Sequence, residues 1–440
     1  MLKFNPYRPG SIVTHGMFAG RLDELQTLEK ILFQTKHENP QHFLLSGERG
    51  IGKSSLLYYL ELVASGKITS LDNATFRFLT LSIELEPSDS FASITKKLGK
   101  CLRDSVAKRE SIKDLAKAGW DFLKRWEILG VKYTSPDNVA EDHELLETLC
   151  ISLNQTVEKL ADHIDGCLIL IDEADKPNTP SLGSLSKLLT ERLTKLGCNR
   201  VTLGLAGVTG IVNKLRESHE SSPRIFHSMT LGPLSAGDRI NVIKKGLAEA
   251  EKKNGSKTDI REDALNSISV LSEGFPNFIQ QFAFCAFDAD TDNVITIEDV
   301  TSGANKKDGA FQQLGQKYFT ELYFEQIGSD EYRQVLRAMA QHEDDWVTKA
   351  QIREAVKMKA GILDNAISAL KKRNIITAQL GQQGIYKLPT KSFAVWLRAF
   401  TVDPTAGTTT GGEEVIEVKG EAKNVGKSLG KSSEAPDSQP

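Results

Sequence analysis

The sequence has few cysteines, and none of them is spaced like a metal-binding or redox motif. Its 440 residues include five cysteines without a C-x-x-C pair, which disfavours both a disulfide framework and a zinc site. We therefore expect free, partly buried thiols. They are Cys101, Cys150, Cys167, Cys198 and Cys285.

Long apolar runs are also missing. No stretch approaches the roughly 20 apolar residues that a membrane-spanning helix needs, and residues Met1–Pro6 lack the apolar core of a signal peptide. We therefore expect a cytoplasmic protein without a membrane partner. With 40% hydrophobic and 26% charged residues, a chain of this length can build two or three hydrophobic cores.

The sequence has no strong excess of charge of either sign. Lys and Arg total 55 and Asp and Glu total 58, a net charge of -3, which argues against a chain that coats nucleic acid through bulk positive charge. Local basic blocks still occur. Lys96–Arg125 holds ten basic and four acidic residues, with Trp120, Phe122 and Trp126 nearby. The block is either a solvated helix face with the aromatics in a core, or a surface for nucleic acid or an acidic partner.

The order of apolar segments predicts a parallel sheet in the first half of the chain. Short apolar runs alternate with segments of helical periodicity, and parallel strands need long crossover connections of this kind. The expected strands are His42–Leu45, Phe76–Ile83, Cys167–Ile171 and Val201–Ala206. A long helical stretch, about residues 90–163, separates the second strand from the third. The predicted fold class is therefore α/β.

A glycine-rich loop after the first expected strand fits the phosphate-binding pattern G-x-x-x-x-G-K-[ST]. It consists of Gly47, Glu48, Arg49, Gly50, Ile51, Gly52, Lys53 and Ser54, and Ser55 follows in the next helix. Glycines let successive backbone amides face phosphate oxygens, and the N-terminus of the following helix adds partial positive charge. We expect Lys53 to reach the β- and γ-phosphates and the Ser54 hydroxyl to ligate magnesium.

A pair of carboxylates follows the third expected strand. The apolar run Cys167–Ile171 ends in Asp172 and Glu173, at the edge of the sheet where ligands of such folds bind. Asp172 is expected to hold the magnesium shell, and Glu173 to polarise the attacking water as a general base. The glycine loop and the acid pair together predict nucleotide hydrolysis.

With these motifs the chain resembles the AAA+ ATPases, and more narrowly the branch related to origin-recognition and replication-initiator ATPases. A lead-in at Phe18–Arg21, a helical lid and a C-terminal winged helix add to the resemblance. It implies a five-stranded P-loop core, ATP and Mg²⁺ as cofactors, and ATP sites completed between neighbouring subunits. Phe18 and Arg21 would then lie against the adenine.

The resemblance and the changes in composition predict five segments. They are a lead-in (1–20), an AAA+ core (21–233) with a helical insertion at about 88–165, an α-helical lid (234–310), a winged-helix domain (311–402) and a tail (403–440). The tail has almost no aromatic residues, so it has too little to bury and is expected to be disordered.

Three further sites come from the resemblance alone. Thr209 matches the first sensor, which orients the attacking water, although a solvent-facing loop threonine is the alternative. Arg224, or Arg216 before it, matches the arginine finger that acts on a neighbouring subunit, with a surface arginine as the alternative. Asn277 stands where many relatives have a cationic second sensor, and this departure implies slow turnover with ATP used as a switch.

The C-terminal module predicts a partner. Residues 332–398 hold twelve basic and five acidic residues, a net +7. Three short helices at 332–340, 349–356 and 362–372 precede two strands at 375–380 and 385–388, an order that indicates a winged helix. DNA-contact candidates on the third helix and the wing are Asn365, Ser368, Lys371, Lys372, Arg373, Gln382 and Gln383. Winged helices also dock proteins, so both partners stay open.

Three hypotheses for function follow. The first is an ATP-binding and ATP-hydrolysing switch that oligomerises with ATP and binds duplex DNA, as in initiators or loaders. The second is a regulatory or defence-type signalling ATPase whose winged helix docks a protein effector. The third, supported by fewer features, is a regulator of a transposase.

Overall fold

The computed structural model describes residues 3–12, 18–108, 139–177, 181–342, 346–373, 375–379 and 382–401. These residues separate into two compact units. The first unit comprises Met1–Thr258 and Gly274–Gln280, and the second comprises Asp259–Glu273 and Gln281–Pro440. The expected tail, and the part of the basic block after Lys108 with its three aromatic residues, lie outside the described residues.

The first unit is built on a five-stranded parallel sheet with the order β2-β3-β4-β1-β5. Its strands are β1 (His42–Gly47), β2 (Leu79–Glu84), β3 (Cys167–Asp172), β4 (Val201–Gly207) and β5 (Phe226–Leu231). The first four lie where the apolar runs predicted them, and the predicted α/β class is confirmed. The apolar pattern did not reveal β5. It is an edge strand in which only Phe226 and Leu231 are buried, so its sequence lacks an apolar run.

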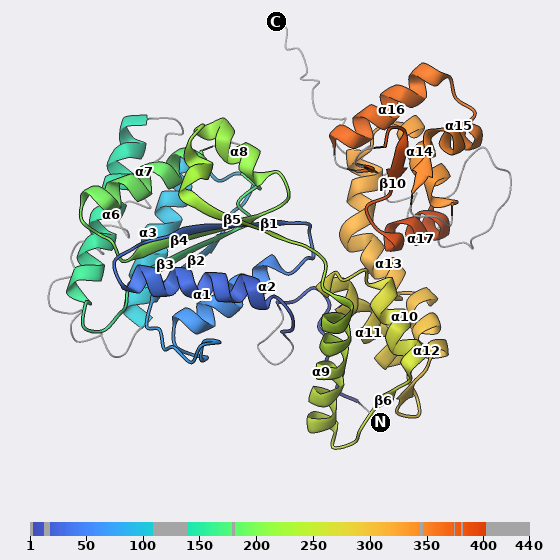
Figure 1. Cartoon of the computed structure of the whole chain (residues 1–440), viewed down its shortest axis with the longest axis horizontal. Coiled ribbons are helices and arrows are strands. Elements are labelled where there is room, and N and C mark those ends of the chain that lie inside the picture. The colour runs from blue at the N-terminus through green and yellow to red at the C-terminus, as the bar shows by residue number, and fades with distance from the viewer. Residues whose placement is uncertain are drawn as a thin grey trace, which may run out of the picture. The chain divides into compact units, whose positions relative to one another are not determined.

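Helices cover both faces of this sheet (Figure 1). On one face lie α1 (Leu22–Lys36) and α2 (Lys53–Ala64). On the other face follow α3 (Phe91–Lys108), α6 (Val139–Lys159), α7 (Leu182–Lys195) and α8 (Ile211–Ser218). The connection from β1 to β2 passes β4 and β3, whereas the connections after β2 run back in the other direction along the sheet. Because each crossover is right-handed, the helix after β1 lies on one face of the sheet and the helices after β2 lie on the other.

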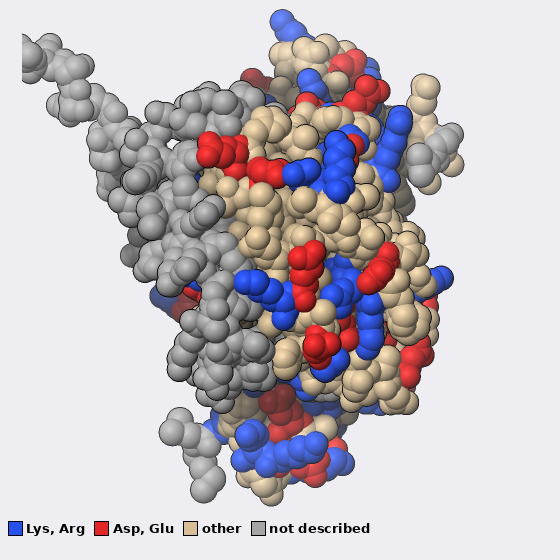
Figure 2. Space-filling view, turned by 90° about the vertical axis from the view of Figure 1, so that its left-hand side faces the viewer, with Lys and Arg blue, Asp and Glu red and all other residues tan. Residues whose placement is uncertain are grey.

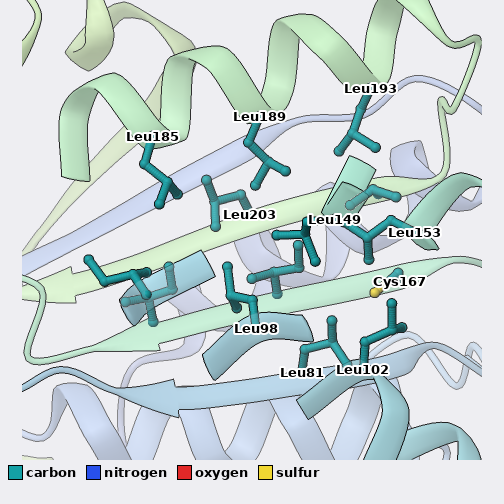
Figure 3. Close-up of a cluster of buried hydrophobic side chains, with 14 of the residues drawn as sticks. Leu81, Leu98, Leu102, Leu149, Leu153, Cys167, Leu185, Leu189, Leu193 and Leu203 are labelled. Carbon is teal, nitrogen blue, oxygen red and sulfur yellow. The ribbon is translucent and has the colours of Figure 1, made fainter. Parts of the chain in front are cut away.

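The core of the first unit lies between β2, β3, β4 and the helices α3, α6 and α7. Leucines at helical spacing on α7 point toward the sheet and lie near leucines of β4 and α6, in a cluster that also includes leucines of α3 (Figure 3). The apolar faces of these helices pack against the apolar side chains of the strands, and together they form a continuous buried layer. All five cysteines are free thiols, four of them buried, as their spacing predicted.

Two more segments complete the first unit. Helix α9 (Ala236–Asn254) starts at Ser235, whose side chain accepts a hydrogen bond from the Asp238 amide. The N-terminal residues 3–12 lie along this helix. The buried Tyr7 hydroxyl donates to the Ile243 carbonyl at 2.8 Å, and Phe4 exchanges two hydrogen bonds with the Asn254 side chain. The lead-in is therefore anchored on α9.

The second unit begins with short helices and ends in a small mixed domain. Its first elements are β6 (Asp259–Ile260), α10 (Glu262–Leu271), the later part of α11 (Pro276–Ala289), β7 (Val294–Ile295), α12 (Ile297–Asn305) and α13 (Ala310–Leu314). Two π-helical stretches follow, η4 (Gly315–Phe319) and η5 (Glu321–Gln326). A Cβ at Gly315 would lie 2.0 Å from Nε1 of Trp396, so the indole packs there because glycine has no side chain.

The elements after the π-helical stretches follow the order of a winged helix. They are α14 (Asp330–Ala340), β8 (Val347–Thr348), α15 (Lys349–Val356), α16 (Ala360–Lys372), β9 (Thr377–Ala378), β10 (Ile385–Lys387) and α17 (Lys391–Phe400). The three strands form an antiparallel sheet in the order β8-β10-β9. The rings of Phe319 and Trp396 pack together 5.8 Å apart, beside Phe393. The three predicted helices and the hairpin are present.

One face of the molecule shows how charged side chains are distributed. On the face drawn in Figure 2, Lys and Arg side chains lie interspersed with Asp and Glu. Within the part of the chain that the structure describes, no helix is long and apolar enough to span a membrane.

The core of the first unit provides a test of stability. Leu153→Ala removes a fully buried side chain on α6, whereas Ile151→Ala on the same helix removes one that is 38% exposed. We expect Leu153→Ala to lower the free energy of unfolding by about 2–5 kcal/mol through lost burial and the cavity left behind. Ile151→Ala should cost much less. Chemical denaturation followed by circular dichroism measures both, and equal losses would contradict this core assignment.

Candidate nucleotide-binding site

The glycine loop joins the end of β1 to the start of α2. Gly50 and Gly52 have φ values of 79° and 100°, a left-handed backbone region that residues with a Cβ rarely adopt. The Ile51 amide donates to the Glu48 carbonyl at 3.3 Å, which closes the turn. Helix α2 begins directly at Lys53. A tight glycine turn that leads into a helix N-terminus is the geometry that binds phosphate groups.

The Lys53 ammonium lies across this loop. Its Nζ donates to the carbonyl oxygens of Gly47 at 2.9 Å and Glu48 at 3.0 Å. Burial lowers the pKa of Lys53, and the nearby carboxylates of Asp172, Glu173, Asp175 and Glu48 act against that decrease. The lysine is therefore a cation held at the loop and within electrostatic reach of the acids that follow β3.

The acid pair lies at the end of β3, at the sheet edge where the glycine loop also starts. The side-chain Oδ1 of Asp172 accepts a hydrogen bond from the Glu173 amide at 2.8 Å. Glu173 has a φ of 52°, an uncommon conformation for a residue with a side chain. Burial raises the pKa of Glu173, while the cations Lys176 and Lys53 lower it. A partly buried carboxylate beside a cationic loop can accept a proton from water.

The lead-in contacts the glycine loop through Arg21. The Arg21 Nη2 donates to the Ile51 carbonyl at 3.1 Å and to the Gly232 carbonyl at 2.5 Å, and Nη1 donates to Glu24 at 3.3 Å. Its side chain is only 9% exposed. Phe18 stacks on Tyr59 of α2 with ring centroids 4.9 Å apart. The structure thus brings both lead-in candidates next to the loop.

Two cavities border the lead-in. The larger, about 790 Å³, is lined by residues 18–25, Tyr59, Leu71 and the start of α9. The smaller, about 30 Å³, is lined by Phe18, Arg21, Ile51, Gly52, Ser55, Pro276 and Gln280, among others. Glycine loop, lead-in and the start of α11 therefore surround one space.

Asn277 lies beside the loop at the first turn of α11. Its backbone amide donates to the Gly50 carbonyl at 3.4 Å. The adjacent Pro276 comes within 3.4 Å of the position that a Cβ on Gly52 would occupy. The position expected for the second sensor is therefore next to the phosphate loop, and it holds an amide instead of a cation.

The remaining catalytic candidates lie on the surface. Thr209 is exposed in the turn between β4 and α8. Arg216 is exposed on α8, where its Nη1 donates to Asn213 Oδ1 at 3.4 Å, and Arg224 is exposed in the short 3₁₀ helix η3 (Ser222–Ile225). Within the described residues, no hydrogen bond or ion pair joins either arginine to the glycine loop.

Sequence reasoning missed several charged residues around the acid pair. Asp175 accepts a hydrogen bond from the Val208 amide, and Lys176 Nζ lies 3.1 Å from Glu84 Oε1 and 3.8 Å from Glu173 Oε2. Glu84 ends β2, the strand beside β3. The only local signal was that Asp175 and Lys176 continue the charged run after β3, which by itself indicates no role.

A parallel sheet of this strand order, with a glycine loop after β1 and two carboxylates after β3, defines the P-loop class of nucleotide-binding proteins. Residues 17–199 match the family described as the AAA ATPase domain. This part of the chain therefore resembles an AAA ATPase domain, which supports nucleotide binding and hydrolysis in general terms.

Similar proteins cover longer parts of the chain. The Walker-type ATPase of Pyrococcus abyssi is 18% identical with a TM-score of 0.55, over 89% of this chain and 98% of that one; at this identity the likeness shows the fold. The ORC2 protein of Aeropyrum pernix is 12% identical with a TM-score of 0.48, over 94% and 99% of the two chains.

One curated relative is described as an uncharacterized HTH-type transcriptional regulator of Methanocaldococcus jannaschii. It is 24% identical over 284 residues, which are 63% of this chain and 65% of the relative. The match thus spans less than two thirds of that relative's length.

The buried Arg21 contacts provide a test of the site. Arg21→Met removes the hydrogen bonds to the Ile51 and Gly232 carbonyls, and bonds from charged donors contribute about 1.5–3 kcal/mol each. We expect the Kd for a fluorescent ATP analogue to rise about tenfold or more, measured by titration. Arg103→Met on α3 is the matched control and should keep the wild-type Kd. An unchanged Kd for Arg21→Met would show that Arg21 does not shape the loop.

Proposed function

We propose that this protein is an ATP-driven switch that binds and hydrolyses ATP at the glycine loop, assembles with other copies in the ATP state and binds duplex DNA through its winged helix. The observation that carries the proposal is that the glycine loop, Lys53 and the acid pair after β3 lie close together. Lys53 lies across the loop and its pKa responds to Asp172 and Glu173.

The residues present fit ATP with Mg²⁺. The loop turns at two left-handed glycines, the Ser54 hydroxyl belongs to the first turn of α2, and Asp172 supplies an oxygen ligand at the end of β3. Oxygen ligands of this kind suit Mg²⁺, which usually binds through one or two carboxylates and the substrate phosphates. Bound there, the cation would supply charge stabilisation at the phosphates.

Each side chain then has a defined task. Backbone amides of Gly47–Ser54 bind the phosphates, Lys53 neutralises their charge, and Glu173 takes a proton from the attacking water. Thr209 orients that water. Phe18 and Arg21 border the space for the adenine, and Ser55 lines the same space.

Two exposed arginines support completion of the site by a second copy. Arg216 and Arg224 are exposed on the surface of the first unit, so either can reach a triphosphate on a neighbouring copy. Asn277 brings no positive charge to the loop from within the same chain. Hydrolysis is therefore expected to be slow in isolated copies and to depend on assembly.

The winged helix supports DNA as the partner. Asn365, Ser368, Lys371, Lys372 and Arg373 are exposed on or directly after α16, and Gln382 and Gln383 are exposed in the wing. Lys371 lies over the Tyr386 ring at 5.9 Å and Arg373 over the Tyr332 ring at 5.8 Å. Cations held against rings lose less freedom on binding phosphate. The M. jannaschii relative is named an HTH-type transcriptional regulator, and this name also favours DNA over a protein effector as the partner.

Two substitutions separate binding from hydrolysis. Lys53→Ala should lose nucleotide binding, because it removes the cation at the loop. Glu173→Gln should bind ATP with the wild-type Kd but hydrolyse it about 10²-fold more slowly, the contribution of a general base. Phosphate release and analogue titration measure the two effects. Glu191→Gln, on the exposed side of α7, is the control, and wild-type turnover in Glu173→Gln would exclude the base role.

DNA binding is tested by gel shift with duplex DNA at low salt, with ATP and without nucleotide. We expect a shift that strengthens with ATP. Replacing Lys371, Lys372 and Arg373 together with alanine should weaken binding and reduce the salt dependence, because each lost phosphate contact lowers that slope by about one. Replacing Lys252 and Lys253 on α9 should change neither. Absence of any shift, together with co-purification of a nuclease-resistant protein partner, would favour the effector-docking alternative.

A further inference from the structure

Three hydrogen bonds join the turn after β3 to β4, to the residue that follows β4 and to α8. The Ala174 amide donates to the Ala206 carbonyl at 2.8 Å. The Val208 amide donates to Asp175 Oδ1 at 2.8 Å, and Lys214 Nζ donates to the Asp175 carbonyl. Asp175 thus contributes both its side chain and its backbone to this junction.

Asp175 has room to do this because β4 ends in glycine. A Cβ at Gly207 would lie 2.9 Å from Asp175 Oδ1 and 2.4 Å from Ile211 Cδ1. Neither separation is compatible with normal packing. The carboxylate therefore fits against the strand end only where no side chain is present.

Asp175 connects two segments that the proposed reaction must hold together. Two residues before it, Glu173 has a left-handed backbone with a φ of 52°, a conformation that persists only where surrounding structure holds it. One residue after its partner Val208 comes the exposed Thr209. The Asp175 carboxylate thus bonds directly between the two segments, beside the Ala174–Ala206 bond.

We propose that Asp175 is a positioning residue that fixes the Glu173 turn and the Thr209 loop in one arrangement, through the hydrogen bond that its carboxylate accepts from the Val208 amide. This inference rests on the proposed ATPase function. Displacement of a reacting group by about 1 Å can cost about 10²-fold in rate, so a residue that touches no substrate can still control turnover.

Substitutions of Asp175 by asparagine and by alanine distinguish its hydrogen bond with the Val208 amide from other roles of the side chain. Asp175→Asn keeps an oxygen acceptor for the Val208 amide and loses the charge, whereas Asp175→Ala loses both. Lys214→Met removes the bond to the Asp175 carbonyl and leaves the Asp175 side chain unchanged. Asp162→Ala is the matched control, because this exposed aspartate precedes β3 at the opposite edge of the sheet.

Steady-state ATP hydrolysis is the first measurement. We expect kcat to fall about tenfold or more in Asp175→Ala with KM within about twofold, and to stay within about threefold of wild type in Asp175→Asn. Lys214→Met should give an intermediate kcat. Wild-type kcat in Asp175→Ala, or an equal loss in Asp175→Asn, would overturn the inference. If Asp175→Ala does not fold, a large loss of kcat in Asp175→Asn overturns the inference in the same way.

Hydrogen exchange on peptides covering residues 207–211 tests the same bond without relying on hydrolysis. The Val208 amide should exchange about tenfold faster in Asp175→Ala than in wild type and Asp162→Ala, and near the wild-type rate in Asp175→Asn. Equal exchange in all four proteins would overturn the inference. Absence of hydrolysis by the wild-type protein, with faster exchange in Asp175→Ala, would instead overturn the proposed function and leave the positioning role supported.

Discussion

The parallel direction of β1, β3 and β4 is the constraint on which the site depends. Because these strands are adjacent in the sheet and run the same way, their carboxyl ends meet at one edge. The glycine loop, the acid pair and the Thr209 turn each follow one of these ends. A single antiparallel strand among them would move its loop to the other edge. The chemistry is thus assembled by the sheet, although its residues are separated by more than a hundred positions.

Charge at that edge is strongly uneven. The half-buried Lys53 ammonium lies within electrostatic reach of the carboxylates of Asp172, Glu173, Asp175 and Glu48, and the Lys176 ammonium lies 3.8 Å from Glu173. A triphosphate adds further negative charge, so this edge requires additional cations before it can bind ATP tightly. Magnesium at the acid pair and an arginine from a second copy would meet that requirement. Under the proposed function, the local electrostatics at this edge favour dependence on a neighbour, in a chain whose total charge is close to neutral.

Sequence patterns predicted the parts of the molecule that depend on local composition. Four buried strands, the phosphate loop and the helices and hairpin of the winged helix follow from apolar runs, glycine spacing and helical periodicity. The edge strand β5 did not, since its central residues face solvent and carry no apolar run. Asp175 also escaped prediction. Its partner, the Val208 amide, lies 33 positions away, and a side chain that bonds to a backbone group leaves no complementary residue to recognise.

The anchoring of the N-terminal residues on α9 has a consequence for the order of synthesis. Tyr7 is synthesised 236 positions before its partner Ile243, and the phosphate loop is likewise synthesised long before the Asn277 amide that bonds to Gly50. At roughly 5–20 residues per second, this delay is on the order of tens of seconds. During that interval the sheet can form while the nucleotide pocket lacks one wall. The N-terminal anchor and the contact of Asn277 with the loop can therefore form only after Ile243 and Asn277 have been synthesised.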